Sequence, residues 1–290
     1  MVKKISLLDD NFWNLLETFN QAIRNFEYDY IYIDALFLGI WTLFLIKYKK
    51  WTAIKVGMIT GFIVYFIDAI MWWNLPAGDP YPSGTYIREY WIGGTKIPNN
   101  LQGYFLLKFG ADFMMTFSYS MFAFAWLYIM FDNIKNQVNK KEILLFTSLY
   151  FASWMLIPYI SLLLHIDDRM IYTHRLMNSQ MPIWIANVII GYSILALIYG
   201  TDYFKSKNPK IIGYVFIIGC IESFFMEFPL FIWGIRPSNL FFLLFETVIL
   251  FHQGAPYLYI AYDKVFPKVG EILKNWFQKR EEKEIVVDIK

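Results

Sequence analysis

Acidic residues inside long apolar stretches are the residues of this chain that point most directly to chemistry. Five of them lie at nearly one depth when each is counted from the nearer polar loop: Asp34, Asp68, Asp112, Glu227 and Glu246. At 1.5 Å per residue this depth is roughly 8–14 Å. An acidic side chain at the centre of a membrane helix costs roughly 2.5–3.5 kcal/mol, so we expect these groups to face the interior of a helix bundle, around one polar pocket.

Four of these carboxyls are predicted to be catalytic: Asp68, Asp112, Glu227 and Glu246. A buried carboxyl can act as a general acid while an ionised neighbour acts as the base, and Glu246 or Asp68 is the predicted acid. Lys108, four residues before Asp112 on the same helix face, can neutralise Asp112. The other three have no cation along their own helices, so a proton, a bound cation or another helix must compensate their charge.

The remaining predicted site residues bind substrate. Asp34 is one of them, although it lies close enough to the helix end to be simply solvated. The others are aromatic residues near the same depth: Trp72, Trp73, Trp91, Trp184 and Trp233. Aromatic faces attract organic cations and can also stabilise a carbocation. The alternative is an ordinary belt of tryptophans at the membrane interface.

Other cofactor chemistry is not predicted. The three histidines, His165, His174 and His252, are too scattered for a multi-histidine zinc site, and the single Cys220 cannot form a redox dithiol. Mg²⁺ or Ca²⁺ held by the four catalytic carboxylates stays an alternative. The segment 165–168, His-Ile-Asp-Asp, has metal-ligand residue types, but such combinations are common in loops.

The elements that must position these residues are membrane helices. The chain has 290 residues, 57% of them hydrophobic and 17% charged, against about 25% charged residues in soluble domains. Seven apolar stretches are long enough to span a bilayer: 29–47, 51–75, 103–131, 142–165, 181–204, 211–235 and 238–262. We therefore predict an all-α integral membrane protein with a seven-helix domain over residues 29–262. The net charge of +2 gives no basis for nucleic-acid binding.

Lysine residues predict the orientation of this bundle. They gather in three short loops, between spans one and two, three and four, and five and six. The positive-inside rule places these loops in the cytoplasm, the N-terminus outside and the C-terminus inside. The two long outer connections, 76–102 and 166–180, are expected to carry function.

The two ends of the chain are predicted to be amphipathic. Residues 1–28 have apolar residues at helical spacing, which favours a helix lying in the membrane interface or an ordinary surface helix, and they do not resemble a cleaved signal peptide. Residues 263–290 are predicted to form a cytoplasmic, amphipathic and basic tail.

A weak internal similarity relates spans one to three to spans five to seven. Asp68 in span two corresponds to Glu227 in span six, and Asp112 in span three corresponds to Glu246 in span seven. This pattern favours a parallel 3+1+3 repeat.

The topology resembles that of microbial rhodopsins, but no lysine lies between Asn239 and Tyr262, so retinal cannot be bound there as a Schiff base. The 3+1+3 outline is similar to that of seven-helix sugar transporters, and to fused membrane-bound lycopene cyclases and fungal seven-helix terpene cyclases. In those cyclases, acidic residues of the bundle carry out the protonation. No contiguous motif identifies any of these families, so the similarity concerns the fold alone.

These features predict a multi-pass enzyme of a prokaryotic cell membrane or its equivalent. It would isomerise or cyclise an apolar substrate, an isoprenoid or another lipid, by carboxylate acid–base chemistry in the outer half of the bundle. Its predicted partners are membrane lipids and an apolar or cationic small molecule. The alternatives are a proton- or cation-coupled transporter of small solutes and a sensor or receptor without retinal. The sequence predicts neither the substrate's identity nor an oligomeric state.

Overall fold

The computed structural model describes residues 21–79, 81–98, 105–136, 139–237, 239–272 and 274–276. It is 73% helical. Seven helical segments are long and apolar enough to cross a membrane, which confirms the predicted number of spans. They are Asp29–Lys47, Trp51–Asn74, Leu106–Lys135, Lys140–Ser161, Gln180–Gly200, Lys210–Ile232 and Leu240–Trp276.

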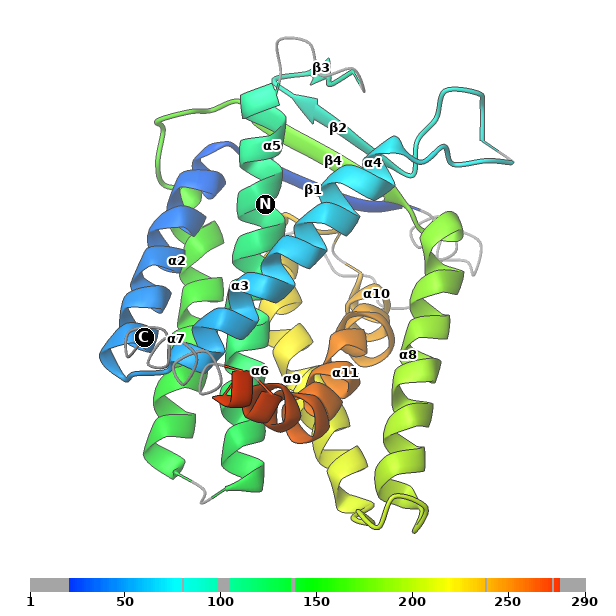
Figure 1. Ribbon diagram of the computed structural model, residues 1–290. Helices are drawn as coiled ribbons and strands as arrows, with labels where there is room; N and C mark the ends of the chain where they lie inside the picture. Colours follow the sequence, from blue (N-terminus) through cyan, green and yellow to red (C-terminus); the bar gives the residue numbers. More distant parts are fainter. Residues whose placement is uncertain are drawn as a thin grey trace, which may run out of the picture.

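The spans form one bundle (Figure 1). Its helices are α2 (Asp29–Lys47), α3 (Trp51–Tyr65), α4 (Trp72–Asn74), α5 (Phe105–Phe113), α6 (Tyr119–Lys135), α7 (Lys140–Ser161), α8 (Met177–Gly200), α9 (Lys210–Ile232), α10 (Leu240–Phe245) and α11 (Gly254–Ile260). Glycines allow close packing of α3 on the third span. A Cβ atom on Gly61 would lie 2.7 Å from the ring of Phe117, so a side chain there would displace that ring.

Three spans contain a wider, π-helical turn close to a predicted acidic residue. These turns are Phe66–Met71, which contains Asp68, Met114–Ser118, which follows Asp112, and Glu246–Leu250, which begins at Glu246. Such turns interrupt the regular hydrogen bonding of a helix and are frequent at functional sites.

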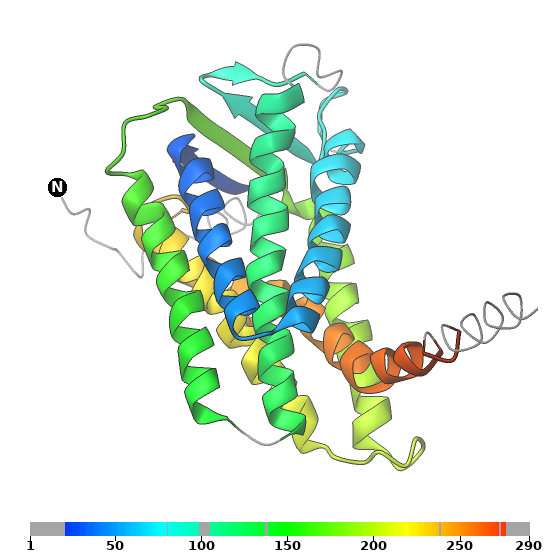
Figure 2. The same ribbon diagram turned by 60° about the vertical axis from the view of Figure 1, so that its left-hand side comes forward.

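A four-stranded antiparallel sheet corrects the all-α prediction. Its strands are β1 (Gln21–Glu27), β2 (Arg88–Ile92), β3 (Thr95–Lys96) and β4 (Met170–Leu176), in the order β1-β4-β2-β3. The two long connections that were expected to carry function supply β2, β3 and β4. The sheet lies across one end of the bundle (Figure 1), which we call the sheet end. The lysine-rich loops lie at the opposite end, the lysine end (Figure 2).

Strand β1 also corrects the prediction of a helix over residues 1–28. All seven of its residues pair with β4, so tertiary pairing overrides the helical spacing of the apolar residues there. Residues 1–20 lie outside the described residues. At the other end of the chain, described residues of the predicted tail continue the last helical segment as far as Trp276, and residues 277–290 lie outside the described residues.

Successive side chains of a β-strand point to opposite faces of the sheet, so the two faces carry different residues. The face toward the bundle carries one arginine from each of three strands: Arg24 on β1, Arg88 on β2 and Arg175 on β4. The opposite face carries Trp91 and Tyr172, whose ring centroids are 5.1 Å apart. The sheet therefore directs positive charge toward the end of the bundle that contains the buried carboxyls.

Candidate functional site

Two sheet arginines bind the carboxylates of spans two and three. Arg88 Nη1 lies 2.5 Å from Asp68 Oδ2, and Arg88 Nη2 lies 2.5 Å from Asp112 Oδ1. Arg175 from the neighbouring strand also donates to Asp68 Oδ2. Lys108 Nζ lies 2.7 Å from Asp112 Oδ2, which confirms the predicted pairing one helical turn apart. These ion pairs connect strands β2 and β4 to spans two and three.

In spans six and seven, Glu227 is bound by two arginines, and Glu246 lies near one of them. Arg24 of β1 donates to Glu227 Oε1 at 3.1 Å, and Arg236 donates from Nε to Glu227 Oε2 at 2.9 Å. Arg236, in the connection between α9 and α10, also places Nη2 3.3 Å from Glu246 Oε1. The prediction that the four carboxyls face the bundle interior is confirmed, because each is at most 7% exposed.

The charge state of the arginines follows from this arrangement. Burial disfavours the charged guanidinium of Arg88, but Asp112 and Asp68 outweigh that effect and raise its pKa. Burial lowers the pKa of Arg175 to about 10, although Asp68 acts in the opposite direction. Both side chains therefore carry a full positive charge at neutral pH. Asp68, Asp112 and Glu227 each accept hydrogen bonds from guanidinium groups, an arrangement that suits ion pairing better than proton donation or binding of a divalent cation, whereas Glu246 has only the longer contact with Arg236.

The predicted tryptophans do not gather around one space. Trp73 is buried, and its ring centroid lies 3.7 Å from Lys108 Nζ. Trp72 is buried at the end of the same span and Trp184 is buried on α8. Trp91 lies on the outward face of the sheet, and the ring of Trp233 contacts that of Tyr159 at 5.0 Å.

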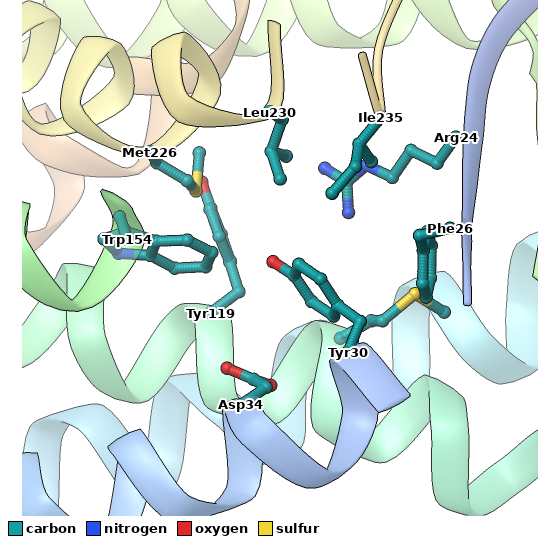
Figure 3. Close-up of a pocket in the computed structure, with 10 residues that line it drawn as sticks. Arg24, Phe26, Tyr30, Asp34, Tyr119, Trp154, Met226, Leu230 and Ile235 are labelled. Atoms are coloured by element: carbon teal, nitrogen blue, oxygen red, sulfur yellow. The ribbon is translucent and has the colours of Figure 1, made fainter. Parts of the chain in front are cut away.

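A small, largely enclosed chamber lies between the sheet and the helices (Figure 3). Its free space is sufficient for about one water molecule. One predicted site residue, Asp34, lines it. The residues that surround it are Arg24, Phe26, Tyr30, Asp34, Met115, Tyr119, Trp154, Met226, Leu230 and Ile235.

Asp34 differs from the other carboxyls of this region. It is 2% exposed, and Ser118 Oγ donates a hydrogen bond of 2.7 Å to its Oδ1. Among the described residues, no arginine, lysine or histidine forms an ion pair with it. In Figure 3 the hydroxyl of Tyr30 points into the space above Asp34. Ser118 is the one described hydrogen-bond donor to Asp34, and a buried carboxyl with so little compensation is stabilised by a proton or by a bound ligand.

Glu222 is another buried carboxyl without a described ion pair, deeper in the bundle. Tyr150 donates from its hydroxyl to Glu222 Oε1 at 3.4 Å, and Ser223 Oγ donates to Oε2 at 3.2 Å. No described cation forms an ion pair with Glu222, and it does not line the chamber. Glu222 can therefore be compared with Asp34, because it is a buried carboxyl that does not border the chamber.

Several residues of the chamber and the sheet were not identified from the sequence as candidates. Tyr30 could have been found, because it lies four residues before Asp34 and therefore on the same helix face. Tyr119 and Trp154 carry no comparable signal, since aromatic residues are common throughout the spans. The three sheet arginines could have been found only by reading the connections as strands.

Comparison of the chain with protein-family models, with curated protein sequences and with solved structures finds no match. The function is therefore inferred from the geometry of the chamber and its surroundings.

Proposed function

We propose that this protein is an integral-membrane enzyme that acts on an apolar substrate, an isoprenoid or a related lipid, by proton transfer in the chamber. The observation that carries the proposal is Asp34: a buried carboxyl that borders the chamber and has no described ion-pair partner. This assigns to Asp34 the role of proton donor that the sequence favoured for Glu246 or Asp68. The arginine-bound carboxylates then hold the sheet over the site.

The chemistry follows from what surrounds Asp34. Its carboxyl donates a proton to one carbon of an alkene, and the rings of Trp154, Tyr119 and Phe26 stabilise the resulting carbocation. The carboxylate so formed then accepts a proton from a neighbouring carbon, and the double bond moves. An isomerisation, or the last step of a cyclisation, is complete without a cofactor.

The walls of the chamber can adapt to a substrate larger than the present space. Met115 and Met226 contribute side chains that are unbranched and flexible, and such side chains rearrange at low cost. Of the polar side chains, Arg24, Tyr30 and Asp34 lie on the strand and helix that begin the described chain, and Tyr119 lies on α6. We therefore assign the movable part of the site to the methionines and the fixed part to β1 and α2.

Our proposal places the protein in a cell membrane with the sheet end outside. Support comes from the lysines of the loops at the opposite end, which include Lys49 and Lys50 between α2 and α3. In this orientation a lipid reaches the chamber from the outer half of the bilayer. The 3+1+3 repeat stays a prediction, supported by the π-helical turns near Asp112 in span three and at Glu246 in span seven.

Deuterium exchange tests the proposal for any lipid that gains a proton in the chamber. The purified protein, reconstituted with a total membrane lipid extract in D₂O, is expected to introduce deuterium into one lipid class, seen by mass spectrometry. Asp34→Asn keeps the size of the side chain and removes the proton donor. We expect the exchange rate to fall by roughly 10²–10⁴-fold, the usual contribution of general acid–base catalysis.

Glu222→Gln is the matched control for this experiment. It removes an equally buried carboxyl that has no described ion pair and does not border the chamber. We expect near-normal exchange from this variant. Absence of deuterium incorporation by the wild-type protein, or equal exchange by Asp34→Asn and the wild type, contradicts the proposal.

A coupled transporter is the second candidate, and the shape of span seven favours it. This span changes from α10 to a π-helical turn at Glu246–Leu250, a 3-10 turn at Phe251–Gln253 and then α11. Discontinuous helices of this kind form ion and solute sites in transporters. A transporter would acidify the lumen of proteoliposomes only when solute is added, and it would not incorporate deuterium into lipid. That result would support transport over catalysis.

A further inference from the structure

A group of potential metal ligands lies outside the chamber, where β1 ends and the connection from α7 to β4 passes. Glu27, His165 and Asp168 each offer one ligand atom, and these atoms all lie within 4.8 Å of one another; Glu27 is half-buried and the other two side chains are exposed. His165 Nδ1 and Asp168 Oδ1 are 3.3 Å apart. The three residues come from two separate segments of the chain, so the fold assembles the group.

The connection that carries two of these ligands is held in place by a buried aspartate. Asp29 is fully buried at the start of α2, and its two carboxylate oxygens accept hydrogen bonds of 2.9 Å from the backbone N–H groups of Ile166 and Asp167. His165 and Asp168 flank these two residues. The pair of ligands is therefore presented by a fixed backbone, which reduces the conformational entropy that ligand binding must overcome.

The charges around the group suit a divalent cation. Glu27 and Asp168 together supply two negative charges, and His165 is a neutral ligand when its imidazole is deprotonated. Arg169, the neighbouring cation, is bound to Asp167 through Nε at 2.8 Å and Nη2 at 2.6 Å. Glu27 Oε2 is shielded from solvent and has no hydrogen-bond partner among the described residues. The group thus has uncompensated acceptor oxygens and no described lysine or arginine bound to its carboxylates.

We propose that Glu27, His165 and Asp168 bind one Zn²⁺ ion or a similar divalent transition metal at the sheet end. One imidazole and two carboxylates are a ligand set that Zn²⁺ accepts, with water in the fourth position. A harder ion such as Mg²⁺ prefers oxygen ligands alone. The ion ties the end of β1 to the connection between α7 and β4, so it stabilises the sheet on the bundle. This site is separate from the chamber and independent of the proposed reaction.

Zinc titration of the full chain in detergent tests the site. Isothermal titration calorimetry with ZnCl₂ is expected to show one ion bound per chain and a rise in melting temperature. His165→Ala and Asp168→Asn should each weaken binding by at least about tenfold and remove the thermal shift. Asp168→Asn keeps the shape of its side chain, so it separates loss of a ligand from loss of folding.

His174→Ala is the control, because His174 lies on β4 of the same sheet outside the group. Its zinc affinity should equal that of the wild type. Failure of the wild-type chain to bind Zn²⁺, or equal binding by His165→Ala and the wild type, overturns the proposal. Loss of zinc binding in His174→Ala with retention in His165→Ala places the ion elsewhere and also overturns it.

Discussion

The sheet end and the lysine end of the bundle use charge in different ways. At the sheet end, Arg88 is 2% exposed and joins two carboxylates of different spans. At the lysine end, Lys50 forms a 2.7 Å ion pair with Glu142, and both side chains remain partly exposed to solvent. The same types of group are thus enclosed at one end and solvated at the other.

This difference explains why the sheet-end carboxylates depend on one another. Removing a charge from water costs several kcal/mol, and a buried ion pair recovers this only when every partner is present. A partly exposed pair is hydrated whether or not it forms, so it contributes about 0–1 kcal/mol. Removal of one partner should therefore cost more stability at the sheet end than at the lysine end.

Arg88→Met should have the largest effect. It removes the group that links Asp68 and Asp112 and leaves both carboxylates buried with less compensation. Breaking such a buried pair costs about 3–5 kcal/mol of unfolding free energy. Denaturant titration of the protein in detergent, followed by tryptophan fluorescence, measures this loss.

Lys50→Met is the comparison for this prediction, because it breaks the Lys50–Glu142 pair at the lysine end. We expect a change of about 0–1 kcal/mol. Equal destabilisation by the two variants would remove the distinction between the two ends.

Glu246→Gln should have an intermediate effect. Arg236 lies 3.3 Å from this carboxyl and keeps its hydrogen bond to Glu227 in the variant, so the loss should stay below that of a broken buried ion pair, at about 1–3 kcal/mol. Deuterium exchange into lipid should continue, since Asp34 is unchanged. A hundredfold loss of exchange in a folded Glu246→Gln protein would instead identify Glu246 as the proton donor.

His174 should produce the smallest effect, seen as a dependence of stability on pH. Burial lowers its pKa in the folded protein, with Lys96 acting in the same direction and Glu89 against it. Below about pH 6.5, the ordinary value for histidine, the unfolded chain therefore binds a proton more readily than the folded chain, and stability falls as the pH decreases. Between pH 7 and pH 5 the melting temperature should fall less steeply for His174→Gln than for the wild type. Identical slopes for the two proteins would contradict this interpretation.

The sequence alone determined the number of spans and the burial of the acidic residues. Both follow from local properties: the length of an apolar stretch, and the cost of a carboxylate in contact with lipid. Lys108 and Asp112 were paired correctly for the same reason, because four residues on a helix fix their distance.

Only the tertiary structure decided which carboxyls receive a cation. Arg175 reaches Asp68 across 107 positions of the chain, and Arg24 reaches Glu227 across 203. These contacts depend on strand pairing between distant connections, and no periodicity in the spans encodes that pairing. Asp34 and Glu246 have similar sequence surroundings as acids in apolar helices, yet Arg236 lies beside Glu246 and no described cation pairs with Asp34. The sequence could show that each buried charge needs a partner, but the partner's identity is set by a fold that brings distant segments together.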